Sequence, residues 1–164
     1  MYPVKLGFDA AIVRLESLLK YEFFSESLVT TVFTVEKTLL RTLRQLIIST
    51  GFSSNITNLM LKTIRGLEAI KKNWEFFDPA HRKLTEIIPE RDWEIIKNNS
   101  EIRNNLVHGS RTYKSELCKN QTIELIQTLK NVKNIFESEY GYSGWTNISK
   151  RNKSVLHVDP KVKK

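Results

Sequence analysis

The residues best suited to chemistry lie between positions 101 and 109, where the sequence reads EIRNNLVHG. Arg103 supplies a fixed cation that can hold a phosphate through two parallel hydrogen bonds. His108 supplies an imidazole that takes or gives a proton near neutral pH. Asn104 and Asn105 add amide groups between them. These residue types together are suited to binding and cleaving a phosphodiester.

The segment is expected to end a helix. Gly109 favours this, because glycine suits the left-handed residue that follows a helix C-terminus. His108 would then lie where the helix dipole favours the protonated imidazole. On an ideal helix, positions five residues apart point about 140° from each other. Asn104 and His108 share a face, whereas Arg103 has to reach around unless the helix ends early.

Glu36 occupies a position where an apolar residue is expected. It lies between Val29 and Leu43 in a heptad stripe. A carboxylate directed at a core is costly unless it is paired. Arg103 is a fitting partner, so we predict a Glu36–Arg103 ion pair that orients the arginine. The structural alternative, a helix-end histidine beside a surface arginine, stays open from the spacing alone.

Composition favours one soluble globular domain with a tail. The chain has 164 residues, of which 40% are hydrophobic and 27% charged. No stretch approaches the roughly 20 apolar residues of a membrane span. The first residues lack the pattern of a secretory signal, and the single cysteine, Cys118, excludes an internal disulfide. A cytoplasmic location is therefore expected.

The net charge of +8 is concentrated at the C-terminal end. Residues 150–164 carry a net +5, whereas residues 1–149 carry only +3. Two interpretations stay open: a solvated tail, or an arm that binds phosphates non-specifically and weakens with salt.

Apolar residues recur at intervals of three and four along the chain, which predicts an all-α, up-and-down bundle of about five helices. Residues 1–140 would form the bundle, and residues 141–164 a turn and a basic, loosely ordered tail. We expect Ser25 to cap the second helix and Trp145 to pin the turn to the bundle. The expected helical regions are residues 8–23, 25–51, 56–77, 90–106 with a break at 98–100, and a last helix that runs through residues 118–136 and ends before Gly141.

Residues 103–109, RNNLVHG, resemble the signature of HEPN domains, in which an arginine with a polar residue directly after it is followed, four to six residues later, by a histidine. Residues 34–44, TVEKTLLRTLR, resemble the second helix of that superfamily, which carries an acidic residue. The helix order agrees as well, so the resemblance covers about residues 5–140.

The resemblance implies a homodimer that cleaves RNA without a metal or other cofactor, with two copies of the motif facing each other across one cleft. His108 would transfer protons, Arg103 would hold the phosphate, Asn104 would assist, and Glu36 would orient Arg103. Three further residues are candidates for contacting the RNA: Asn105, Arg111 and Lys114.

HEPN ribonucleases commonly belong to prokaryotic toxin–antitoxin, abortive-infection and CRISPR-associated systems, so a cognate antitoxin or immunity protein is a further expected partner. In members paired with nucleotidyltransferase antitoxins, a modified tyrosine lies two residues after the histidine. Here that position is Ser110, and the nearest tyrosine is Tyr113. Two alternatives stay open: a non-catalytic HEPN dimer that binds RNA, signals or confers immunity, and a helical interaction domain whose basic tail binds nucleic acid.

The remaining candidate residues carry less chemistry. His81 is expected to cap or line a helix start, and Cys118 lies on an apolar stripe and is expected in the core. Arg151 and His157 repeat the arginine–histidine spacing in the tail, where no packed element would fix their geometry. The histidines and the cysteine show no metal-ligand spacing.

Overall fold

The computed structural model describes residues 7–147 and 149–156. Within these residues every regular element is an α-helix, which confirms the predicted class. The described residues form seven helices, rather than about five. They are α1 (Phe8–Lys20), α2 (Phe24–Ser49), α3 (Ser54–Leu61), α4 (Gly66–Phe77), α5 (Leu84–Ile87), α6 (Glu90–Val107) and α7 (Ser115–Tyr140).

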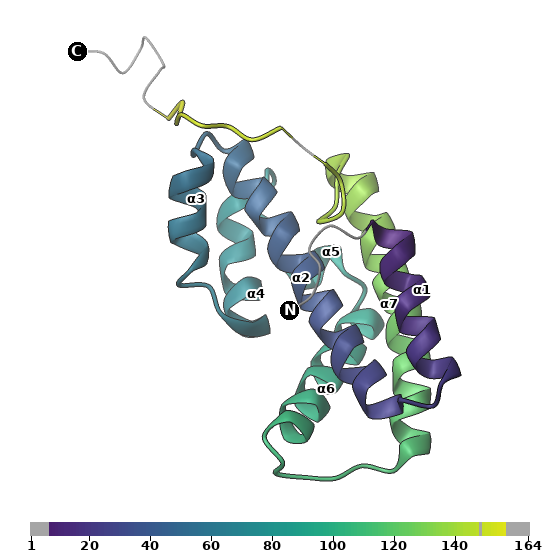
Figure 1. Cartoon of the computed structure of the whole chain (residues 1–164). Coiled ribbons are helices and arrows are strands. Elements are labelled where there is room, and N and C mark those ends of the chain that lie inside the picture. The colour runs from purple at the N-terminus through teal and green to yellow at the C-terminus, as the bar shows by residue number, and fades with distance from the viewer. Residues whose placement is uncertain (1–6, 148, 157–164) are drawn as a thin grey trace, which may run out of the picture.

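The long helix α2 is the centre of the bundle. It packs against α1, α3, α4, α6 and α7. Figure 1 shows α3 and α4 on one side of α2, with α1 and α7 on the other. Val32, Leu39 and Leu43 of the predicted stripe on α2 are buried, whereas Val29 is partly exposed. The stripe from Val32 onward is thus the face that builds the core.

Threonines account for much of the polar surface that α2 buries. Thr31, Thr34, Thr38 and Thr42 each donate a hydroxyl hydrogen bond to the carbonyl four residues earlier, at 2.7–2.8 Å. These bonds satisfy the hydroxyls within the helix, so they need no partner from the core.

The predicted third helix, residues 56–77, is wrong, because it divides into α3 and α4. Arg65 adopts an extended backbone conformation, with φ −119° and ψ 128°. Gly66 follows at φ +78°, in the left-handed region that glycine tolerates. The apolar spacing continues across the break because Ile64 and Leu67 both enter the core from the turn.

Two other details of the helical prediction are wrong. Residues 98–100 do not break α6, which runs unbroken from Glu90 to Val107. Asn99 is buried and donates its side-chain amide to the Ile95 carbonyl at 2.8 Å, while its side-chain oxygen is buried without a hydrogen-bond partner among the described residues. Ser25 does not cap α2, which begins one residue earlier, at Phe24.

The segment after α7 packs back onto α2. Gly141 ends α7 at φ +73°, as predicted. Trp145 is pinned to the bundle, as expected: its indole N–H donates to the Thr38 hydroxyl at 2.9 Å. At Gly144, a Cβ atom would lie 2.7 Å from the Thr38 carbonyl oxygen. Only glycine therefore fits where this segment crosses α2.

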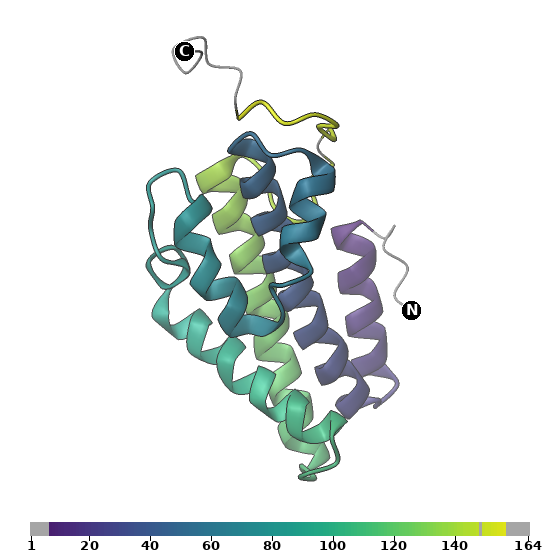
Figure 2. The same cartoon turned by 90° about the vertical axis from the view of Figure 1, so that its left-hand side faces the viewer.

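The described part of the tail lies across the end of α2 (Figure 2) and is hydrogen-bonded there. Arg151 donates from Nη1 to the Ile48 carbonyl at 2.9 Å, and its own carbonyl accepts from the Ser54 amide at 2.7 Å. The Val155 amide donates to the Gly51 carbonyl at 2.8 Å. Arg151 thereby caps carbonyls at the C-terminus of α2. No helix in the described ranges combines the length and the apolar character that crossing a bilayer requires.

Candidate functional site

An ion pair joins α2 to α6. Arg103 donates from Nη2 to Oε1 of Glu36, which confirms the predicted pair. Ser100, one turn earlier on α6, donates its hydroxyl to the same oxygen at 3.2 Å. The Glu36 and Arg103 side chains are 16% and 21% exposed, so the pair lies at the edge of the core. Pairing there offsets much of the cost of placing a carboxylate in the apolar stripe.

The arginine of this pair is incompletely satisfied. Its Nε–H is buried and has no hydrogen-bond partner among the described residues. A buried donor without a partner costs about 1–3 kcal/mol. An anionic oxygen that reached Nε would recover that energy, so Arg103 can still donate a hydrogen bond to an anionic ligand.

A glycine turn ends α6 directly after the predicted motif. Gly109 has φ +64°, and its amide donates to the Leu106 carbonyl at 3.3 Å. The Ser110 amide donates to the Asn105 carbonyl at 3.0 Å. These two bonds form a Schellman motif, so the predicted helix end is confirmed.

His108 is the last residue of this helix end and is exposed. Its backbone amide donates to the carbonyl of Asn104, which is also exposed. α6 continues to Val107, and no hydrogen bond joins the Arg103 and His108 side chains in the described part of the chain. Within one copy the two predicted catalytic groups are neighbours along the chain without a hydrogen bond between them.

Asn105 holds the loop that follows α6. Its side-chain amide donates to the Tyr113 hydroxyl at 3.0 Å, and its side-chain oxygen accepts from the Ser110 hydroxyl at 3.1 Å. Both ends of the amide are thus used within the loop. The structure gives Asn105 a positioning role, while contact with RNA stays a prediction.

The other two candidate RNA contacts lie on the same loop. The Arg111 guanidinium lies 5.2 Å from the centroid of the Tyr113 ring. Lys114 is exposed and directly precedes α7. Both cations are on the His108 side of the site. The described residues contain no group of three or more acidic, histidine or cysteine side chains arranged to hold a metal ion.

A shallow groove of about 350 Å³ lies between α2 and the end of α6. Val29 on α2 and Leu106 on α6 line it, together with Val107, which is 57% exposed, and the polar residues Ser25, Glu26 and Thr30. His108 directly follows Val107 in the chain but is not part of the lining.

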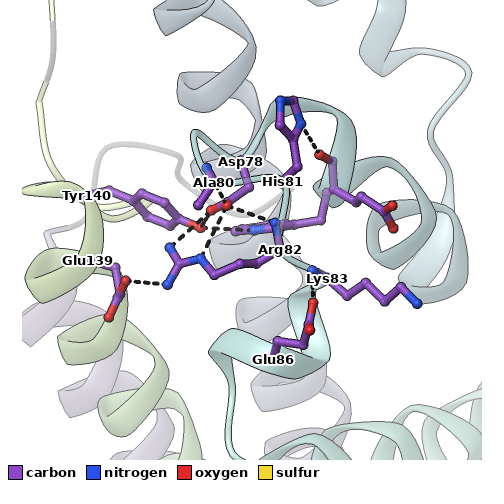
Figure 3. Close-up of polar contacts among 10 residues, drawn as sticks. Asp78, Ala80, His81, Arg82, Lys83, Glu86, Glu139 and Tyr140 are labelled. Atoms are coloured by element: carbon purple, nitrogen blue, oxygen red, sulfur yellow. Dashed lines mark hydrogen bonds and ion pairs between the residues drawn. The ribbon is translucent and has the colours of Figure 1, made fainter.

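A second polar cluster lies at the other end of the bundle (Figure 3). Asp78, after α4, accepts hydrogen bonds from the Tyr140 hydroxyl at 2.6 Å and from the Ala80 amide at 2.9 Å. Arg82 donates to both Asp78 oxygens and pairs with Glu139 at 2.7 Å. The cluster thereby ties the loop after α4 to the C-terminal end of α7.

Burial and hydrogen bonding shift the acidities in this cluster. Burial alone would raise the Asp78 pKa, but the hydrogen bonds from Tyr140, Arg82 and Ala80 outweigh it, and the pKa is lowered. Burial and the bond to Asp78 raise the Tyr140 pKa. Since each Asp78 oxygen is already saturated, the cluster is equipped to stabilise the fold rather than to react.

His81 does not cap a helix start, so that prediction is wrong. Its ring Nδ1 lies 3.1 Å from the Glu75 carbonyl oxygen, near the end of α4. His81 adopts φ +54°, which turns the chain sharply between α4 and α5. Cys118 is fully buried, as predicted. His157 lies outside the described residues.

Comparison with protein-family models, curated proteins and solved structures yields no match. The resemblance to HEPN domains therefore rests on the motif residues and on Glu36.

Several site residues escaped the sequence analysis. Ser100 was treated as part of a helix break, although its position three residues before Arg103 places both on one helix face. Tyr113 was named only as the tyrosine nearest to the modified position of other family members, whereas its hydroxyl accepts a hydrogen bond that anchors the loop. Phe33 and Lys37, which flank Glu36 on α2, form part of a groove described below.

Proposed function

We propose that this protein is a homodimeric, metal-independent endoribonuclease of the HEPN type, acting in a prokaryotic defence or toxin–antitoxin system. The Glu36–Arg103 ion pair carries the proposal. It joins the only acidic position in the α2 stripe to the arginine of the motif, and it leaves that arginine with an unpaired donor.

The reaction would begin at the ribose 2′-hydroxyl. His108 would accept its proton, and the oxygen would attack the adjacent phosphorus. The bond from phosphorus to the 5′-oxygen then breaks, that oxygen takes a proton from an imidazolium, and a 2′,3′-cyclic phosphate remains. Arg103 would stabilise the charge that develops on the phosphate, with Asn104 as an additional donor. DNA would be spared because it lacks the attacking hydroxyl.

A second copy of the chain would complete the site. Within one copy no hydrogen bond joins the Arg103 and His108 side chains, and a single imidazole cannot be both base and acid at once. The groove at Val29, Leu106 and Val107 offers a surface for dimerisation at the end of α6, directly before His108 in the chain.

Cleavage of single-stranded RNA in EDTA tests this function. We expect the wild type to cut and His108→Ala to lose about 10²–10⁴-fold in rate. The fold should be preserved, because His108 is exposed. His157→Ala, at the similar tail spacing, should cut normally. An undiminished rate for His108→Ala in EDTA would place the chemistry elsewhere, and a monomer by light scattering at micromolar concentration would argue against the composite site.

A non-catalytic RNA-binding dimer is the second candidate. The observation in its favour is the commitment of Arg103 to Glu36, combined with the absence of a hydrogen bond between the Arg103 and His108 side chains among the described residues. In that case the wild type would bind RNA with a salt-dependent affinity and leave it intact.

A further inference from the structure

A second groove, of about 360 Å³, adjoins the Glu36–Arg103 pair on the side of α2 that faces the turn between α3 and α4. Glu36 belongs to both features, because it lines this groove and holds Arg103. Whatever occupies the groove therefore lies beside the phosphate-binding cation of the proposed site. Its apolar lining comes from Phe33, Leu40, Leu61, Ile64 and Ile70.

The groove also carries three exposed cations: Lys37 from α2, and Lys62 and Arg65 from the turn. Arg65 is fixed there by a hydrogen bond from its Nε to the Lys62 carbonyl, at 3.3 Å. Glu36 is the one acidic residue in the lining, and Arg103 already neutralises it. The groove thus combines an apolar floor with uncompensated positive charge.

Phe33 places an aromatic ring among these cations. It is 39% exposed, and the Lys37 ammonium lies 5.5 Å from its ring centroid. Single-stranded nucleic acids are bound by this combination, in which bases stack on an aromatic ring and cations track the phosphates. A base against Phe33 would place its phosphates within reach of Lys37.

We propose that this groove binds the single-stranded RNA that flanks the scissile phosphate. One base stacks on Phe33, and the phosphates on either side lie against Lys37, Lys62 and Arg65. The assignment rests on the proposed ribonuclease function, which it extends from the cleavage chemistry to the substrate: unpaired RNA with at least one unstacked base. An acidic peptide could satisfy the charges but would gain nothing specific from the aromatic ring.

The test measures binding of wild-type protein to a labelled, fully 2′-O-methylated single-stranded oligonucleotide, which cannot be cleaved by 2′-hydroxyl attack. Fluorescence anisotropy over a salt series gives the affinity and its salt dependence. Replacing Lys37, Lys62 and Arg65 together by glutamine should flatten the slope of log K against log salt by about 2. The affinity at 0.1 M salt should fall roughly 100-fold.

A matched variant controls for net charge. Replacing Lys20, Lys72 and Lys83 by glutamine removes the same charge from exposed positions outside both the groove and the basic tail. This variant should bind within about 3-fold of the wild type, because distant exposed charges are largely screened. Equal losses of RNA affinity in the two triple variants would overturn the assignment of the groove as an RNA-binding site.

Phe33→Leu isolates the stacking contribution. It keeps an apolar side chain and all three cations, so the salt slope should be unchanged. The affinity should still fall about 5-fold or more, because base–aromatic stacking is lost. An unaltered affinity would overturn the base-binding role, and equal groove-dependent binding of polyglutamate would identify an acidic peptide as the ligand instead.

Failure of this inference is distinguishable from failure of the proposed function. If RNA binding depends on the groove but unmodified RNA is not cleaved in EDTA, the ribonuclease function is wrong and the RNA-binding role of the groove is retained. If the groove triple variant cleaves subsaturating RNA at the wild-type rate, the RNA-binding role of the groove is wrong and the ribonuclease function is retained.

Discussion

Two charged clusters join distant parts of this bundle, and they differ in what they leave unsatisfied. Around Asp78 both carboxylate oxygens accept hydrogen bonds, and the side chain is completely buried. Around Glu36 the side chains remain partly exposed, and the Arg103 Nε–H has no partner among the described residues. A saturated cluster can stabilise a fold but has nothing left for a ligand, whereas an unsaturated cluster sacrifices stability and retains binding capacity.

The largest effect should come from breaking the saturated cluster. Asp78→Ala leaves Tyr140 and Arg82 without their acceptor, so we expect a loss of roughly 3 kcal/mol in the free energy of unfolding. Urea denaturation measures it, with the exposed Glu94→Ala as control. Cleavage per folded molecule should not change. A loss below about 1 kcal/mol would contradict the structural role.

Breaking the unsaturated cluster should affect activity instead. Arg103→Lys keeps the charge but loses the planar fork, so RNA cleavage should fall about 10²-fold. The melting temperature should stay within about 3 °C of the wild type, because the pair is partly exposed. Arg82→Lys is the counterpart in the other cluster and should cut RNA normally. If Arg82→Lys lost activity and Arg103→Lys kept it, the two roles would be reversed.

Acid should act selectively on the Asp78 cluster. The folded-state pKa of Asp78 is lowered from 3.8, so its stabilising contribution is complete above about pH 4. That contribution is lost as the pH falls further, because the unfolded state binds the proton first. The difference in unfolding free energy between wild type and Asp78→Asn should therefore shrink below pH 4. A difference that stays constant with pH would show that the carboxylate charge is irrelevant.

The smallest effect concerns the turn that carries His108. Gly109 has φ +64° and open space around its Cβ position, so Gly109→Ala adds backbone strain without a clash. We expect a loss of about 1 kcal/mol in unfolding free energy. Gly109→Asn should lose less, since asparagine tolerates the left-handed conformation. Equal losses would point to a cause other than φ.

The sequence predicted the features that depend on local pattern. The heptad stripe located α2, Gly109 and Gly141 marked helix ends, and the acidic residue at position 36 pointed to its arginine partner. Each of these signals, either the apolar pattern itself or a residue that interrupts it, can be recognised within a single helix.

The sequence did not predict features that depend on distant partners. Asp78 and Tyr140 are separated by 62 residues, and nothing near either one indicates the other. The division between α3 and α4 was hidden because Ile64 and Leu67 keep the apolar spacing while the backbone changes direction. The prediction of a helix break at residues 98–100 was wrong because Asn98 faces solvent, Asn99 donates within α6, and Ser100 donates to Glu36 on α2.

Because α2 is central, the two halves of the candidate site should differ in the rate at which their backbone amides exchange with solvent. Amides in the middle of a helix that packs against five others exchange with solvent only when the whole domain unfolds. The loop after α6 is held by a few exposed or half-buried hydrogen bonds, so its amides should exchange through local opening. Glu36 thus lies on the most slowly exchanging helix, and His108 lies beside a loop that opens locally. We therefore expect the position of His108 to change many times before the helix that holds Glu36 and Arg103 together unfolds once.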